Sequence, residues 1–161
     1  MKYILFVLLF TSAACTVYLP NKDKVLLASY KNHKFKTVRT TAYTHNEKDH
    51  MKYGRTTAIG TRLKCGKICS AASDWSVFPV GTVFKIKGDD TEYIVEDYGS
   101  ALVGTTTIDI YKPSLYAMNK WGTRHVDIKI IKIGSYKKSL KILKGRTKYW
   151  HVRKMVKSLQ A

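Results

Sequence analysis

The middle of the chain alternates apolar and polar residues, and this period of two predicts β-strands. Residues 83–87 (VFKIK) alternate strictly, and the Gly-Asp-Asp turn at 88–90 joins them to a second run at 92–96 (EYIVE). Further strands are predicted at residues 38–44, 107–111 and 125–133. One short helix is predicted at 115–120, because Pro113 and Ser114 precede it and favour a helix start. Closely spaced strands with one short helix favour a small, mainly β barrel over a βαβ sheet.

The C-terminal segment changes to a helical period. Tyr149, Val152, Val156 and Leu159 recur at helical spacing, which predicts an amphipathic helix. From residue 137 to the end, the chain carries nine basic residues and no acidic one. Two interpretations stay open. The helix either packs on the barrel and exposes a basic face, or binds a membrane or the cell wall.

The N-terminus has the order of a secretory signal. Lys2 precedes an apolar run at 3–10, and Thr-Ser-Ala-Ala leads into Cys15, whose placement resembles that of a lipidated bacterial cysteine. Cleavage after Ala14 that leaves a free or disulfide-bonded Cys15 is the alternative. The predicted parts of the chain are a signal peptide (1–14), a lipidated cysteine with a tether (15–37), a β-barrel (38–134) and a basic tail (135–161).

The net charge of the chain limits the kinds of partner that it can bind. The chain has 29 Lys and Arg against 11 Asp and Glu, a formal net charge of +18. Such a surface favours polyanions. Because export makes nucleic acid a poor partner, we expect anionic lipid, wall phosphates or the carboxylates of peptidoglycan instead. The expected location is the cell envelope, with the lipid on Cys15 and the basic tail as the two contacts to a membrane; a soluble periplasmic or secreted protein is the alternative.

Cys65 and Cys69 form a CxxxC pair, and an oxidising compartment predicts a disulfide between them. A zinc site is the alternative, disfavoured because no cluster of His or Cys at ligand spacing accompanies the pair. Two reduced thiols remain the third state. His45, Asp49 and His50 lie in a polar loop, where solvation is favoured over metal binding. No metal and no cofactor are therefore predicted.

The carboxylates that could carry chemistry lie in one window, because every acidic residue except Asp23 falls between Glu47 and Asp127. Asp109 stands inside an alternating strand, so its carboxylate should lie on the face opposite the neighbouring isoleucines. Partial burial there would raise its pKa, the condition for a general acid near neutral pH. Asp97 ends another strand and is followed by Gly99 and Ser100, which let a bulky ligand approach.

These residues also carry a family resemblance. The run from Asp97 to Gly104 (DYGSALVG), followed by 108–111 (IDIY), resembles the signature of the 3D domain, which is named for three aspartates. Other motifs agree in order along residues 38–133: TAY at 41–43, TAIG at 57–60, ASD at 72–74, PVGT at 79–82 and NKWG at 119–122. That domain is similar to the barrel of membrane-bound lytic murein transglycosylase A. The resemblance implies a six-stranded double-psi β-barrel.

The resemblance also implies cleavage of peptidoglycan glycan strands at the β-1,4 bond between N-acetylmuramic acid and N-acetylglucosamine, in the periplasm at the outer membrane. By position in the motif, Asp109 corresponds to the single acid/base and Asp97 to the neighbouring aspartate that shapes the site. Asp74 corresponds to the first of the three, although a bond to the turn that follows it is favoured. The residues expected to bind substrate are Asp74, Tyr43, Tyr98, Gly99 and Ser100.

Two classes of function follow. The first is a lytic transglycosylase or related glycosidase. The second is a non-catalytic glycan-binding module, in the manner of expansin-like psi-barrels. An Asp109 with raised pKa on a surface shared with Asp97 would favour the enzyme. An Asp109 fully bonded to backbone amides in a flat aromatic surface would favour the module.

Overall fold

The computed structural model describes residues 36–48 and 50–161. The predicted signal peptide, Cys15 and almost all of the predicted tether lie outside the described residues, as does Asp49. Within the described part, no helix is long and apolar enough to cross a membrane.

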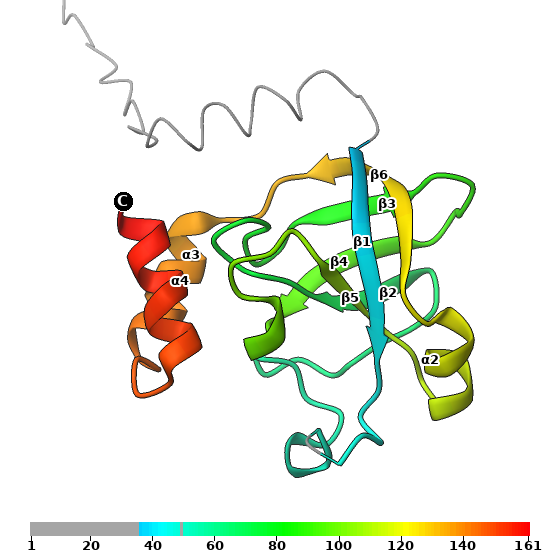
Figure 1. Cartoon of the computed structure of the whole chain (residues 1–161), viewed down its shortest axis with the longest axis horizontal. Coiled ribbons are helices and arrows are strands. Elements are labelled where there is room, and N and C mark those ends of the chain that lie inside the picture. The colour runs from blue at the N-terminus through cyan, green and yellow to red at the C-terminus, as the bar shows by residue number, and fades with distance from the viewer. Residues whose placement is uncertain (1–35, 49) are drawn as a thin grey trace, which may run out of the picture.

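Six strands form one sheet that closes on itself (Figure 1). Their order around the ring is β1-β5-β2-β4-β3-β6, and β6 pairs with β1 to complete it. The pairs β1–β5 and β2–β4 are parallel, and the other four are antiparallel. The strands are β1 (Lys36–Tyr43), β2 (Ile68–Ala72), β3 (Val83–Ile86), β4 (Glu92–Asp97), β5 (Ile108–Tyr111) and β6 (Arg124–Lys132).

The predicted mainly β fold is therefore confirmed, with its strands arranged as a ring of six. The five strands expected from alternation are present within one or two residues of their predicted bounds. The predicted short helix is α2 (Leu115–Trp121), and its N-cap Ser114 accepts a hydrogen bond from the amide of Ala117. Two short 3₁₀ turns, η1 (Met51–Tyr53) and η2 (Ser100–Leu102), lie in the loops.

Strand β2 was not predicted from the sequence. Its residues are mostly small (ICSAA), and its last four are all buried, so they show no alternation between apolar and polar side chains. The strand lies between β4 and β5, and its outer face is also covered. A strand that is buried on both sides has no period of two to detect.

One large hydrophobic cluster fills the ring and continues under its C-terminal helices. Strands β3 to β6 contribute Phe84, Val95, Ile108, Ile110 and Ile128 to it, and Trp75 and Phe78 close it from the loop after β2. The same cluster includes Leu143, Val152 and Met155, which are fully buried.

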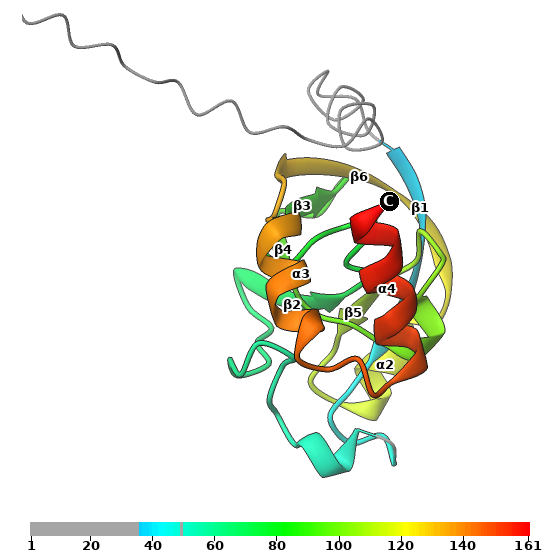
Figure 2. The same ribbon diagram turned by 90° about the vertical axis from the view of Figure 1, so that its left-hand side faces the viewer.

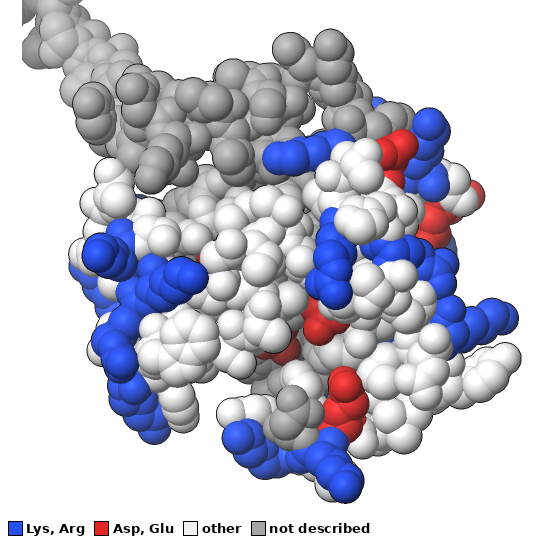
Figure 3. Space-filling view, in the orientation of Figure 1, with Lys and Arg blue, Asp and Glu red and all other residues white. Residues whose placement is uncertain are grey.

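Those last three residues belong to a helical hairpin, α3 (Tyr136–Lys144) and α4 (Trp150–Gln160), which packs against one end of the ring (Figure 2). The predicted amphipathic helix is α4, whereas α3 was not predicted separately. Of the two interpretations of the tail, the structure corresponds to a helix that packs on the ring and exposes a basic face. The apolar face of the hairpin is buried, and its lysines face outward. The basic side chains of the hairpin are visible at the left in Figure 3.

A tight junction joins the hairpin to the ring. The amide of Gly134 donates to Thr82 Oγ1 (3.1 Å), and the amide of Ser135 donates to the carbonyl of Val80 (3.0 Å). The buried hydroxyl of Ser139 in turn accepts from the amide of Val80 (3.0 Å). A Cβ atom at Gly134 would clash with the backbone of Pro79, Val80 and Thr82, so only glycine fits there.

We therefore expect Gly134→Ala to destabilise the protein by about 2–3 kcal/mol, because overpacking against backbone cannot be relieved by a side-chain rotation. Urea unfolding would measure the loss. Gly66→Ala is the matched control, because no atom lies within 4 Å of the added Cβ. Equal stability of the two variants would contradict the assignment of a close approach at Gly134.

Candidate functional site

The two aspartates expected to carry chemistry lie in one row across three neighbouring strands. Ala72 of β2 pairs with Asp109 on one side and with Asp97 on the other. Thr41 of β1 pairs with Asp109 and extends the row. Two strand spacings place the Cα atoms of the two aspartates about 10 Å apart. Side chains that are paired across strands share a face, so both carboxylates face the same side of the sheet.

A β-bulge makes this row possible. Val95 pairs with Ala71 but Asp97 pairs with Ala72, so the residue between them, Glu96, has no partner on β2. Without the bulge, Asp97 would share the face of Val95, which is fully buried in the core. The extra residue turns Asp97 to the outer face, where Asp109 already lies opposite Ile108 and Ile110.

The carboxylate of Asp109 accepts a hydrogen bond from one side chain and can accept more. Thr41 Oγ1 donates to Asp109 Oδ1 at 2.7 Å, and no backbone amide among the described residues donates to this carboxylate. Burial raises the pKa of Asp109 to about 6, against the hydrogen bond from Thr41, which favours the ionised form. The predicted raised pKa and orientation of Asp109 therefore have a structural basis.

Asp97 is more firmly fixed. Its side chain is 7 % exposed, and Oδ1 accepts hydrogen bonds from the amides of Tyr98 (2.9 Å) and Ala58 (3.2 Å). Burial nevertheless raises the pKa of Asp97 to about 6, although these two bonds and the charges of His50 and Arg146 oppose the rise. Two carboxyls that titrate near neutral pH on one surface are a feature of sites that exchange protons.

Tyr43 lies two residues after Thr41 on β1 and carries a buried hydroxyl with no partner among the described residues. Its side chain is 4 % exposed and packs with Leu63, Ala72, Leu102 and Tyr111 in a second hydrophobic cluster. Burial, followed by the charges of Asp97 and Asp109, raises the pKa of Tyr43 well above its usual value. The hydroxyl therefore stays protonated, and it is a donor without an acceptor next to both carboxyls.

The other residues expected to bind substrate divide into two groups. Tyr98, Gly99 and Ser100 follow Asp97 directly and are partly or fully exposed, so they can contact a ligand on this face. Asp74 is buried instead. Its Oδ1 accepts from the amide and hydroxyl of Ser76, and its Oδ2 accepts from the amide of Gly104 (2.7 Å). Asp74 thus bonds the turn that follows it and the loop after η2.

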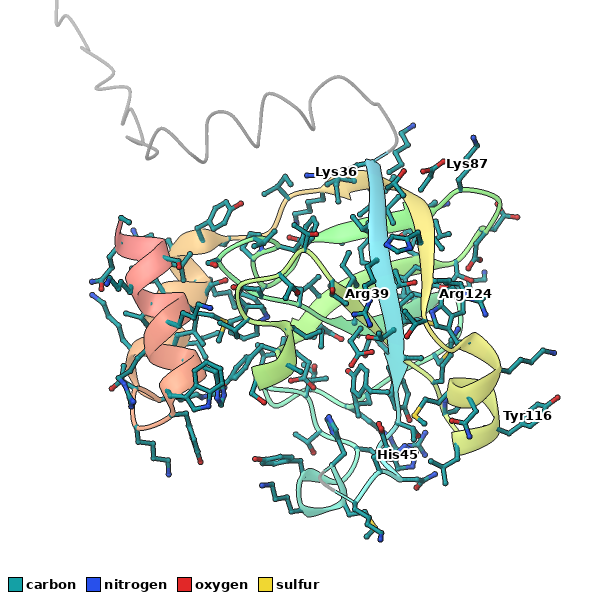
Figure 4. The ribbon with its side chains drawn as sticks, in the orientation of Figure 1. Lys36, Arg39, His45, Lys87, Tyr116 and Arg124 are labelled. Atoms are coloured by element: carbon teal, nitrogen blue, oxygen red, sulfur yellow. The ribbon has the colours of Figure 1, made fainter. Side chains whose placement is uncertain are left out.

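Three residues near the row were not singled out as site residues from the sequence. Thr41 holds Asp109, and Arg39, two residues earlier on β1, donates to Thr107 Oγ1 (3.4 Å) on the same side of the ring (Figure 4). His50 lies near enough to both aspartates for its charge to affect them, and its Nδ1 is buried without a partner among the described residues. Only the pairing of distant strands and loops brings these residues together.

Acidic side chains gather near the centre of the face in Figure 3, with basic side chains around them. Glu96 is also buried, but it is neutralised by Lys64 (2.8 Å) and accepts a hydrogen bond from Ser70, so it is structural. Over the described residues, no group of three or more His, Cys, Asp or Glu could hold a metal ion.

Cys65 and Cys69 are separate thiols in the structure, with their Sγ atoms 2.9 Å apart. A disulfide bond would be about 2.05 Å long, so the structure does not contain the predicted disulfide. In this state Cys69 donates an S–H hydrogen bond to Cys65, which lowers the pKa of Cys65 and raises that of Cys69. This arrangement is the reduced state among the three alternatives.

The raised pKa values predict a dependence of stability on pH. An aspartate with a folded-state pKa of about 6 instead of 3.8 binds its proton more tightly when folded, so its contribution to stability is lost as pH rises from about 4 to 6. Asp109→Asn should therefore increase the free energy of unfolding by about 1–3 kcal/mol at pH 7.5 and leave it nearly unchanged at pH 4.

Chemical denaturation at the two pH values would measure this difference. The exposed residue Asp90 provides the control, because Asp90→Asn should change the unfolding free energy little at either pH. An Asp109→Asn variant that is less stable than the parent at pH 7.5 would show that the Asp109 carboxylate is stabilising and that its pKa is not raised.

Comparison with known proteins gives one family match, over part of the chain. Residues 69–132 match the family model of the 3D domain. The matched segment runs from β2 to the end of β6 and contains Asp74, Asp97 and Asp109, whereas β1 and the α3–α4 hairpin lie outside it. The search of curated proteins gave no match. The 3D family is associated with cell-wall domains of the lytic transglycosylase type. Residues 69–132 of the chain therefore match the 3D domain.

Proposed function

We propose that this protein cleaves the glycan strands of peptidoglycan as a lytic transglycosylase, with Asp109 as the acid/base. The observation that carries the proposal is the state of Asp109. Its carboxyl has a pKa of about 6, Thr41 is its one hydrogen-bond partner among the described residues, and it shares the outer face with Asp97. The 3D family and its association with cell-wall chemistry support the same substrate.

The proposed reaction needs one carboxyl group. Protonated Asp109 donates its proton to the glycosidic oxygen as the bond from that oxygen to C1 of N-acetylmuramic acid breaks. The resulting carboxylate then accepts the proton of the muramic 6-hydroxyl as that oxygen bonds to C1, which gives a 1,6-anhydro product. Because Thr41 occupies Oδ1, Oδ2 is the oxygen left to carry the proton. A pKa near 6 supports both roles in turn.

The neighbouring residues fit a sugar substrate. The hydroxyl of Tyr43, which has no partner within residues 36–48 and 50–161, can donate a hydrogen bond to an oxygen of a bound saccharide. Arg39 supplies a cation beside the row for a carboxylate of the substrate. Asp97, fixed by two amides, is suited to orient a hydroxyl or to stabilise positive charge at C1.

We further propose that the ring has the double-psi crossing of the transglycosylase barrel. The presence of two parallel pairs within a six-stranded ring supports this topology.

The second candidate is a glycan-binding module without cleavage. The two amide bonds to Asp97 are of the kind that a structural carboxylate makes. Asp109, by contrast, accepts no backbone amide bond within the described residues, and this difference favours the enzyme.

Incubation of purified peptidoglycan with the full chain carrying Cys15→Ser would test the reaction, with mass spectrometry of the released muropeptides. We expect anhydro-muropeptides from this protein and a loss of at least about 100-fold in rate for Asp109→Asn, because general acid catalysis contributes roughly 10²–10⁴-fold. The rate should fall as pH rises above about 6, since the first step needs the protonated carboxyl.

Asp90→Asn serves as the matched control and should keep full activity, because Asp90 is exposed and lies outside the row. Products with a free reducing end would show that the reaction is hydrolysis and not transglycosylation. Retention on peptidoglycan without release of any product would support the binding module in place of the enzyme.

We also propose that the protein is exported and anchored by lipid on Cys15, because its proposed substrate lies outside the cytoplasm. Metabolic labelling with palmitate in a bacterial host should label the protein, and Cys15→Ser should abolish the label. Label that persists in Cys15→Ser would refute the assignment, whereas export of unlabelled parent protein would indicate the soluble alternative.

A further inference from the structure

The α3–α4 hairpin reaches the candidate site through one arginine. Arg146 lies in the turn between the two helices and is partly buried. Its Nη2 donates to the carbonyl of Ala58 at 2.8 Å, and its Nη1 donates to the hydroxyl of Tyr98 at 3.3 Å. One side chain therefore joins two segments that are far apart in the sequence, and both belong to loops at the site.

The same two residues hold Asp97. The amides of Ala58 and Tyr98 donate to Asp97 Oδ1, at 3.2 and 2.9 Å. Arg146 thus holds the carbonyl of Ala58 and the hydroxyl of Tyr98, while the backbone amides of the same two residues hold the carboxylate of Asp97. Arg146 is therefore connected to Asp97 by two routes, one through Ala58 and the other through Tyr98.

Arginine is suited to this arrangement. Its planar guanidinium presents donors in a fixed geometry, so two acceptors bound to it are held at a fixed separation, which the ammonium group of lysine does not impose. Its charge also favours ionised Asp97 and opposes the rise in pKa caused by burial. Tyr43, His50 and Asp109 are further titratable groups near Asp97, and His151 contacts the ring of Tyr98 from α4 (6.0 Å between centroids).

We propose that Arg146 is a positioning residue for Asp97, so that the helical hairpin is a working part of the site although it lies outside the matched domain. Its effect on cleavage rests on the proposed function. Its effect on the Asp97 carboxyl does not, and the two can be measured separately.

Carboxyl-detected NMR would follow the titration of Asp97, and hydrogen exchange would follow the amides of Ala58 and Tyr98, in the full chain carrying Cys15→Ser. The variants are Arg146→Gln, Arg146→Lys and the control Arg153→Gln. Arg153 lies on the same hairpin and donates to the carbonyls of Thr147 and Lys148 (both 3.0 Å). Its replacement therefore removes the same charge and loosens the same turn without breaking a contact to Ala58 or Tyr98.

We expect Arg146→Gln to raise the pKa of Asp97 and to accelerate exchange of both amides on the order of tenfold, as the clamp on their segments is lost. Arg146→Lys should keep the pKa nearer to that of the parent, because the charge remains, but exchange should still accelerate. Arg153→Gln should change neither quantity. An unchanged pKa and unchanged exchange in Arg146→Gln would overturn the proposal, as would equal changes in Arg153→Gln.

If Arg146→Gln fails to fold, Arg146→Lys alone tests the proposal. Unchanged amide exchange at Ala58 and Tyr98 in Arg146→Lys would equally overturn it. In the muropeptide assay, Arg146→Gln should lower kcat roughly tenfold with little change in KM, and Arg146→Lys should recover part of the loss. Absence of cleavage by the parent protein would refute the proposed function, while the NMR comparison would still decide the role of Arg146.

Discussion

The pairing of β2 with both β4 and β5 is the constraint on which the site depends. Ala72 is the shared partner of Asp97 and Asp109, and the bulge at Glu96 sets which side of the sheet Asp97 faces. A slip of one residue in either pairing would exchange inner and outer side chains and place a carboxylate in the core. The small side chain of Ala72 also packs with Tyr43 and Leu102 in the second hydrophobic cluster.

The two carboxylates share a similar pKa but differ in how they are held. Two backbone amides fix Asp97, whereas one hydroxyl orients Asp109 and leaves its other oxygen without a partner in the described part of the chain. Burial of ionisable groups costs stability at neutral pH, and the large apolar cluster inside the ring offsets that cost. A rigidly held Asp97 beside a less constrained Asp109 that carries the proton is an arrangement suited to acid/base chemistry.

The helical hairpin combines a structural and a proposed functional role. Leu143, Val152 and Met155 extend the core of the ring, so the hairpin is not an independent tail. Its turn then reaches the loops around Asp97 through Arg146. The basic residues on its outer side remain exposed, and a surface of this kind favours polyanions.

Local patterns in the sequence determined much of the fold. Five strands and α2 were predicted, because alternation and capping act over a few neighbouring residues, and Asp97 and Asp109 were identified from their places in strand ends and motifs. Strand β2 was missed because it is buried on both sides, and the cysteine pair lies as thiols where a disulfide was expected. Tertiary structure alone decided the burial of the Tyr43 hydroxyl and the contacts of Arg146 to residues 48 and 88 positions away. Closure of the ring and docking of the hairpin bring those groups together, and no local pattern encodes such distant contacts.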